Sequence, residues 1–254
     1  MSEPLPGLRP DWPAAVGAFV STRAGGVSAP PFDSLNLGIA VGDDAEAVAE
    51  NRRRFAAALG ADPVWLRQVH GSRVVHIGAG DAALPAPQAD AAWTSDDGVA
   101  CVVQVADCLP VLFAASDGRA VAAAHAGWRG LAGGVLEATL TALCEGAGCE
   151  PSAVQAWLGP CIGPRHFEVG ADVLVAFDAN PAGSPWFSPR PRADGSAAWL
   201  ADLPGLARQR LQRAGVAAVH GGRWCTVSEP SRFFSHRRDR VSGRFAAAIW
   251  RTVG

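Results

Sequence analysis

The chain has 254 residues, 49% of them hydrophobic, and a formal net charge of −2 at pH 7. This length and apolar content can bury a sizeable core, and no internal repeat or low-complexity linker divides the chain, so we expect one domain over residues 1–254. The small net charge gives no general attraction to nucleic acid or anionic lipid, and no apolar run is long enough to span a membrane.

The basic residues are all arginine, and the chain contains no lysine. This excludes enzymes that need a Schiff-base lysine or a P-loop lysine, and therefore pyridoxal-phosphate enzymes and P-loop nucleoside triphosphatases. Residues 1–13 are rich in proline and lack the basic and apolar regions of a secretory signal. We therefore expect a cytoplasmic protein whose six cysteines remain thiols.

The N-terminal part predicts a strand, a glycine-rich loop and a helix. Residues 16–21 form the predicted strand, and the loop 23–26 either brings backbone N–H groups near an anion or makes an ordinary turn. Aspartates at 43 and 44 predict the start of a helix over 45–59. Arg52 shares a face of this helix with Val48, Phe55 and Leu59, so it needs a partner, either an internal carboxylate or an anionic substrate group.

Two strands in the middle of the chain end at residues that can bind metal. Residues 65–71 alternate in character and predict a strand that ends at His70 and a glycine. After a short strand at 74–77 and a surface loop at 78–87, residues 98–105 form a nearly continuous apolar run. This run is typical of a strand buried on both faces, and Cys108 lies just beyond its end.

A predicted hairpin brings Cys108 close to a second histidine. The apolar runs 111–115 and 120–124 flank an Asp-Gly pair, which is a strong hairpin signal. A two-residue loop pairs Ala115 with Ala120 and sets Pro110 opposite His125. Cys108 and His125 then emerge at the same end of two neighbouring strands.

Two histidines and one cysteine are the donor set of a catalytic zinc site, because three protein ligands leave one tetrahedral position open for water. His70, Cys108 and His125 are therefore candidate metal ligands. Two other interpretations stay open. Free cysteines are commonly buried and single histidines commonly hydrogen-bonded, without any function; alternatively, Cys108 is the nucleophile of a hydrolase with His125 as its base.

The C-terminal part mixes helices and strands without regular alternation, which favours an α+β fold. We predict helices at 131–144, 170–177 and 203–214, strands at 216–225 and 245–250, and a strand followed by a turn at 157–163. The loop 179–195 is rich in proline and glycine and is either a lid or a connection. Residues 233–240 combine phenylalanines with arginines, which we interpret as a pocket wall that stacks on a base and binds phosphate rather than as a nucleic-acid surface.

Eight motifs, in order along the chain, resemble those of the laccase-domain family. They are STRAGGVS at 21–28, SLNLG at 34–38, VGDD at 41–44, QVHG at 68–71, ADC at 106–108, HAGWRG at 125–130, WLGP at 157–160 and SHRRD at 235–239. The resemblance implies one domain of four layers, α/β/β/α, with mixed sheets, and zinc bound by His70, Cys108 and His125. Cys161 and His236 depart from the family pattern, which often has Ala and Tyr there.

Members of this family have been called polyphenol oxidase, purine nucleoside phosphorylase and peptidoglycan editing factor. The resemblance implies a zinc-dependent purine nucleoside phosphorylase that also deaminates adenosine, acting on adenosine, inosine or methylthioadenosine. The alternative is amide hydrolysis of a UDP-MurNAc-L-Ser type precursor. We expect no multicopper chemistry, because six histidines and one methionine cannot furnish several copper centres.

We expect only small-molecule partners, with no nucleic acid and no membrane. The residues expected to contact the substrate or its anionic group are Arg23, Asn36, Arg52, Arg129, Phe234 and Arg237.

Overall fold

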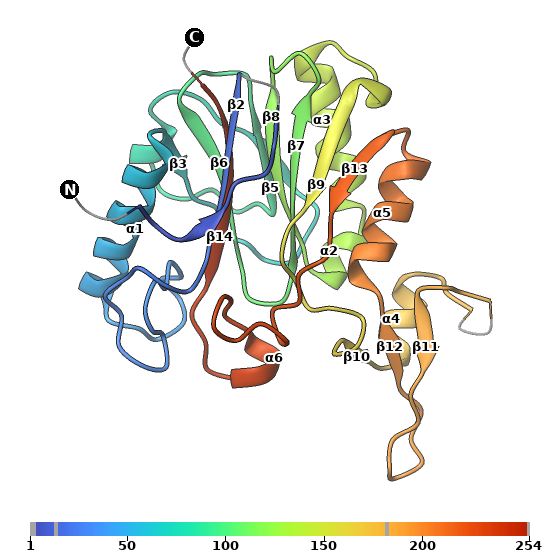
Figure 1. The fold of residues 1–254 in the computed structure, drawn as a ribbon. Helices are drawn as coiled ribbons and strands as arrows, with labels where there is room; N and C mark the ends of the chain where they lie inside the picture. Colours follow the sequence, from blue (N-terminus) through green and yellow to red (C-terminus); the bar gives the residue numbers. More distant parts are fainter. Residues whose placement is uncertain (1–3, 13–14, 181–182, 253–254) are drawn as a thin grey trace.

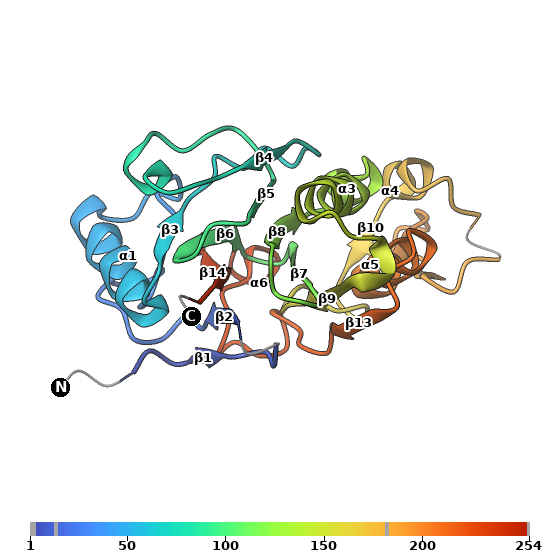
Figure 2. The ribbon, with the colours of Figure 1, turned by 90° about the horizontal axis from the view of Figure 1, so that it is seen from above.

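The structure is a computed structural model that describes residues 4–12, 15–180 and 183–252. Two mixed β-sheets pack face to face, and helices cover the outer face of each, so the fold has the four layers α/β/β/α (Figures 1 and 2). The predicted α+β class with mixed sheets is confirmed. No helix in the described ranges is long and apolar enough to cross a membrane.

The first sheet has five strands in the order β1-β2-β14-β6-β3. Their bounds are Gly7–Leu8 (β1), Val16–Ser21 (β2), Phe245–Arg251 (β14), Val99–Val105 (β6) and Asp62–Val64 (β3). Only the β6–β3 pair is parallel among these neighbours. Strand β14, although close to the end of the chain, therefore lies in the middle of the sheet, between β2 and β6.

The second sheet has six strands in the order β13-β9-β7-β8-β5-β4. Their bounds are Ala218–Gly221 (β13), Val154–Leu158 (β9), Leu109–Ala115 (β7), Val121–Ala126 (β8), Ala91–Thr94 (β5) and Val74–His76 (β4). A three-stranded sheet of Glu168–Val169 (β10), Trp199–Ala201 (β12) and Phe187–Pro189 (β11) lies at the lower edge of the molecule in Figure 1.

The helices lie outside the two sheets. Their bounds are Ala45–Leu59 (α1), Trp128–Ala132 (α2), Val135–Ala147 (α3), Ala171–Ala176 (α4), Leu203–Arg213 (α5) and His236–Asp239 (α6), with short 3₁₀ turns at Asp81–Ala83 and Pro151–Ala153. Helix α1 covers the first sheet, whereas α3 and α5 cover the second. Asp44 caps α1 as predicted, because its carboxylate accepts the Ala47 N–H at 2.8 Å.

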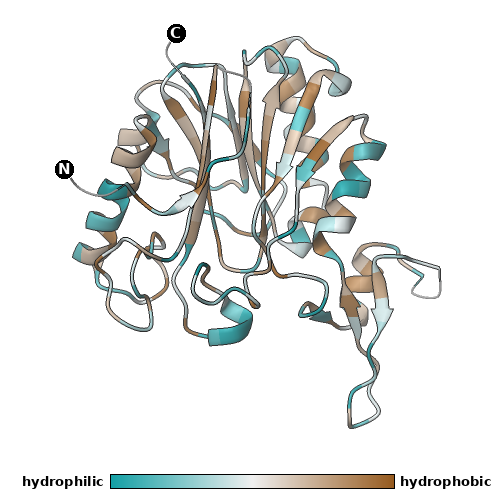
Figure 3. Ribbon diagram, in the orientation of Figure 1, coloured by the Kyte–Doolittle hydropathy of each residue, from teal (hydrophilic) through white to brown (hydrophobic). Residues whose placement is uncertain are grey.

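Both faces of each central strand are buried, which explains the long apolar runs in the sequence (Figure 3). Along β7, Val111 and Phe113 face the helices, whereas Leu112 and Ala114 face the other sheet. In the first sheet, Val103 contributes to the core between the sheets. The two sheets thus form a rigid base for the loops at their ends.

Four predicted elements differ from the structure. The predicted helix 131–144 is two helices, because Gly133 and Gly134 interrupt it and Gly134 has a φ of 88°. The strand predicted at 216–225 ends at Gly221, whose φ is 73°. The loop 179–195 contains β11, and its residues 181–182 lie outside the described ranges. The segment 65–71 is not a strand; β3 ends at residue 64.

A candidate metal centre and its pocket

The hairpin of β7 and β8 has the predicted register. The Ala115 N–H donates to the Ala120 carbonyl at 3.0 Å, and Pro110 lies opposite His125. Cys108 immediately precedes β7 and His125 lies near the end of β8. The turn sequence alone therefore determines that these two side chains meet at one end of the sheet.

His70 reaches the same place on a segment without a strand ladder. The side chain of Gln68 takes the place of backbone pairing with β6: its amide donates to the Gln104 carbonyl at 2.9 Å, and its oxygen accepts the Gln104 N–H at 2.8 Å. Beyond this anchor, His70 adopts a φ of 61°, in the left-handed region. The expected strand fails because side chains, not backbone groups, attach this segment to the sheet.

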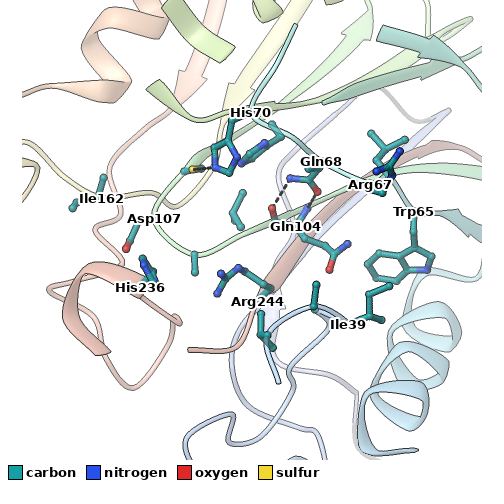
Figure 4. A pocket seen from close by; sticks show the side chains of 18 of the residues that line it. Ile39, Trp65, Arg67, Gln68, His70, Gln104, Asp107, Ile162, His236 and Arg244 are labelled. Atoms are coloured by element: carbon teal, nitrogen blue, oxygen red, sulfur yellow. Dashed lines mark hydrogen bonds between the residues drawn. The ribbon is translucent and has the colours of Figure 1, made fainter. Parts of the chain in front are cut away.

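The three predicted ligands converge. The candidate ligand atoms of His70, Cys108 and His125 lie within 4.8 Å of one another, and Cys108 Sγ is 3.7 Å from His70 Nε2 (Figure 4). A Cβ on Gly127 would lie 2.8 Å from His70 Cδ2 and 3.0 Å from Cys108 Sγ, so only glycine leaves room for this grouping.

The donor set fits a metal ion such as zinc. Asp90 Oδ1 lies 2.9 Å from His125 Nδ1, which leaves Nε2 of that ring for a ligand. His125 is 3% exposed and Asp90 is fully buried. A metal held by a thiolate and two neutral imidazoles, with a carboxylate behind one of them, is a common arrangement in catalytic zinc sites.

Burial and charge have opposite effects on the pKa values of the half-buried Cys108 and the buried His125. Burial by itself would raise the pKa of the Cys108 thiol, but the adjacent His125 and His70 outweigh it and lower that pKa to about 6. Burial would lower the pKa of His125, but the Cys108 thiolate and the Asp90 carboxylate raise it to about 9. Without metal, the two side chains therefore form a thiolate–imidazolium pair between about pH 6 and about pH 9.

This pair predicts a pH-dependent reactivity of the metal-free protein. Alkylation of Cys108 by iodoacetamide is expected to fall as the pH drops through about 6, whereas an ordinary thiol loses reactivity near 9.0. The half-exposed Cys144 is an internal control, because burial and then the charges of Cys149 and Glu150 raise its pKa to about 12. Mass spectrometry of the alkylated peptides measures both sites, and a Cys108 midpoint near 9.0 would contradict the pairing.

The candidate metal ligands line one end of a pocket of about 720 Å³. Its apolar walls include Trp65, Leu66, Trp128, Ile162, Phe167 and Leu203. Figure 4 shows His70 at one end and Trp65 and Ile39 at the other, with Gln68 and Gln104 between His70 and Trp65 and with Arg244 between His236 and Ile39. Arg52 stacks its guanidinium 4.0 Å from the centroid of the Trp65 ring. The pocket therefore has a metal-binding end and an aromatic, cationic end.

Of the predicted substrate residues, Arg52 and Arg237 line this pocket. Arg52 donates to the Leu37 carbonyl at 2.9 Å, and burial lowers its pKa to about 10. Arg237 is positioned by Asp107, whose carboxylate accepts the Arg237 backbone N–H at 2.6 Å. Asp107 itself has a φ of 87° and directly precedes Cys108, so one strained turn positions both a ligand and a cation.

The other four predicted substrate residues lie outside the pocket lining. Arg23 forms an ion pair with Asp33 at 3.2 Å and stacks on the fully buried Phe234. Arg129 is exposed and stacks on Trp128. Asn36 is buried, and its oxygen accepts the backbone N–H groups of Gly38 and Arg244, at 2.9 and 2.8 Å respectively. The expected convergence of Arg23, Arg52 and Arg129 on one anion is therefore corrected: only Arg52 faces the pocket.

Sequence reasoning missed two residues of the site, Asp90 behind the candidate ligands and Arg244 in the pocket wall. Asp90 lies just before β5 and belongs to no recognised spacing, and Arg244 directly precedes β14, outside the strand predicted at 245–250. Arg244 donates to the Ser242 and Gly243 carbonyls, and burial lowers its pKa. Their only sequence signal is a charged side chain beside an apolar strand.

The two departures from the family pattern take different places. Cys161 is fully buried behind Ile162, whose carbonyl its thiol contacts at 3.5 Å. His236 is exposed at its helix start and lines the pocket. Only His236 therefore changes the pocket wall directly.

Comparison with known proteins agrees with this architecture. Residues 17–252 match the family model described as "Multi-copper polyphenol oxidoreductase laccase". The chain is 50% identical to a protein of Pseudomonas aeruginosa named purine nucleoside phosphorylase, over 96% of this chain and 97% of that protein. It is 48% identical to the purine nucleoside phosphorylase YfiH of Escherichia coli, over 95% and 97% of the two chains.

Solved structures show the same fold. A Neisseria meningitidis protein superimposes with a TM-score of 0.88 at 46% identity, covering 97% of this chain and 99% of that one. YlmD from Geobacillus stearothermophilus superimposes with a TM-score of 0.84 at 35% identity, covering 94% and 93%. With residues 17–252 matched by the family model and nearly the whole chain covered by relatives at about 50% identity, the chain belongs to the family of laccase-domain proteins.

Proposed function

We propose that this protein is a zinc-dependent purine nucleoside phosphorylase that also deaminates adenosine. One observation carries the proposal: a candidate metal-binding group and two half-buried arginines, Arg52 and Arg244, that form no ion pair with any described residue line the same pocket. Neither Arg52 nor Arg244 forms an ion pair within the described part of the chain. Because an unpaired buried charge is costly, the pocket favours an anionic guest such as phosphate.

The roles of the chain's own residues follow from their positions. His70, Cys108 and His125 would hold zinc, which when bound supplies the Lewis acidity that activates water for deamination. Asp90 holds the His125 ring with Nε2 facing the site. Among the described residues, this is the one group of three or more metal-binding side chains, which argues against several copper centres.

Arg52 and Arg244 would bind and orient phosphate for attack on the ribose C1′, because guanidinium groups match phosphate oxygens in a bidentate manner. The apolar walls, including Phe167 and Ile162, exclude water and accept the flat face of a purine. A pocket of about 720 Å³ has room for a nucleoside and phosphate together.

The proposal is tested with purified protein incubated with adenosine, with and without phosphate. We expect about one zinc per chain by elemental analysis. We also expect adenine and ribose 1-phosphate only when phosphate is present, and inosine in either case. Absence of all three products would refute the proposal. Release of serine from a serine-bearing muramoyl nucleotide in a parallel incubation would instead support the amide-hydrolase alternative.

A second candidate, a cysteine hydrolase, is favoured by one specific observation. The Asp90 carboxylate contacts His125, and His125 in turn contacts Cys108. In a cysteine hydrolase, these residues would be the orienting carboxylate, the base and the nucleophile, respectively. Added zinc separates the two candidates. If the zinc enzyme is correct, zinc protects Cys108 from alkylation and raises activity; if Cys108 is a nucleophile, zinc inhibits turnover.

A further inference from the structure

One buried carboxylate contacts both histidines of the candidate metal centre. Asp90 precedes β5, is fully buried, and its Oδ1 lies 2.9 Å from His125 Nδ1. The same oxygen accepts the His70 backbone N–H at 2.8 Å, and Oδ2 accepts the Gly71 N–H at 2.8 Å. The Val69 N–H reaches both oxygens at 3.2 Å.

The two histidines depend on this carboxylate to different degrees. His125 lies within β8, and its place opposite Pro110 is set by the strand ladder. Residues 69–71, which we call the His70 arm, belong to no strand, and all three of their backbone N–H groups donate to Asp90. His70 also adopts a φ of 61°, a conformation that persists only where surrounding contacts determine it.

We infer that Asp90 is a positioning residue that brings His70, rather than His125, to the metal. This inference rests on the metal centre of the proposed function. Removing the carboxylate would release the His70 arm while β8 keeps His125 in place. The site would then offer one imidazole and one thiolate instead of two imidazoles and one thiolate.

Asparagine is the informative replacement because its side chain has the size of the aspartate side chain, but only one of its two terminal atoms accepts hydrogen bonds. With its NH₂ at the position of Oδ2, the amide faces the Gly71 N–H; with its NH₂ at the position of Oδ1, it faces the His70 N–H. In either orientation the amide NH₂ faces a backbone N–H, which is also a donor, so the His70 arm loses at least one hydrogen bond.

The test compares D90N with H70A, and with D96N as a matched control. Asp96 lies just beyond the other end of β5 and accepts the exposed Ala79 N–H at 3.0 Å, so D96N makes the same chemical change away from the arm. X-ray absorption of the zinc-loaded proteins counts imidazole ligands. We expect D90N to lose one imidazole, as H70A does, and zinc affinity to fall by about 10–100-fold, whereas D96N matches the wild type.

A metal-independent readout separates this inference from the proposed function. In the metal-free protein, hydrogen exchange of residues 69–71 is expected to accelerate in D90N while that of β8 stays unchanged. Two imidazoles with unchanged affinity and exchange in D90N would overturn the inference. If the wild type binds no zinc, the proposed metal centre fails, and the exchange experiment alone decides whether Asp90 positions the arm. If D90N does not fold, D90E, which keeps the charge but displaces the carboxylate, is expected to show the same changes to a smaller extent.

Discussion

Replacing Cys108 with alanine is expected to abolish zinc binding and turnover while the protein stays folded. Cys108 supplies the only sulfur of the candidate ligand group and lies at a strand end rather than within the core between the sheets. Loss of a hydrogen-bond partner behind a ligand weakens zinc binding by about 10–100-fold. Loss of a direct ligand such as Cys108 should weaken zinc binding more than this. The melting temperature of the metal-free protein should change by less than about 4 °C, equivalent to roughly 1 kcal/mol in a chain of this size.

Elemental analysis and activity assays of C108A, with C144A as the control, provide the measurement. Cys144 is a half-exposed thiol near the end of α3 and is not part of the ligand group, so C144A should keep its zinc and its activity. Full zinc occupancy in C108A together with complete loss of turnover would contradict the ligand role and favour the nucleophile role of Cys108.

Replacing Arg52 with lysine is expected to weaken phosphorolysis by roughly tenfold to a hundredfold in kcat/KM, equivalent to about 1.5–3 kcal/mol. The charge is retained, but an ammonium group cannot reproduce the bidentate guanidinium contact with phosphate. Deamination uses water instead of phosphate and should be reduced much less. Initial rates at varied phosphate concentration measure the change, which should appear as a higher KM for phosphate.

Arg53 offers a matched control on the same helix. It is exposed, and its guanidinium binds Glu50 at 2.7 Å, so R53K should leave both reactions unchanged. Equal losses of phosphorolysis and deamination in R52K, without a change in apparent phosphate affinity, would count against an anion-binding role. Unfolding of R52K would instead mark the contacts of Arg52 with Leu37 and Trp65 as structural.

Much of the metal centre is predictable from local sequence. The Asp-Gly turn sets the register that places Pro110 opposite His125, and the register determines which end of the sheet carries Cys108. Helix α1 begins and ends where its capping residues predict, at Asp44 and at Gly60, whose φ is 64°. Each of these features depends on residues close together in the sequence, so turn and capping rules suffice.

The positions of the arginines could not be predicted in this way. Arg23 and Arg52 were both expected to bind an anion, but the loop after β2 brings Asp33 next to Arg23, and no carboxylate in the described ranges forms an ion pair with Arg52. Whether a buried cation is already paired depends on side chains from other elements. Arg244, near the other end of the chain, also lines the pocket. Its surroundings likewise depend on side chains from other elements.

The sequence by itself determined the fold class, the candidate ligand group and the hairpin that joins Cys108 to His125. Only the tertiary structure decided how His70 joins them, because its segment lacks a strand ladder and is held by Asp90, a residue 20 positions further along the chain. Hydrogen bonds between a side chain and a distant backbone leave no periodicity in the sequence. His70, the third candidate ligand, therefore reaches the site through contacts that exist only once both sheets have assembled.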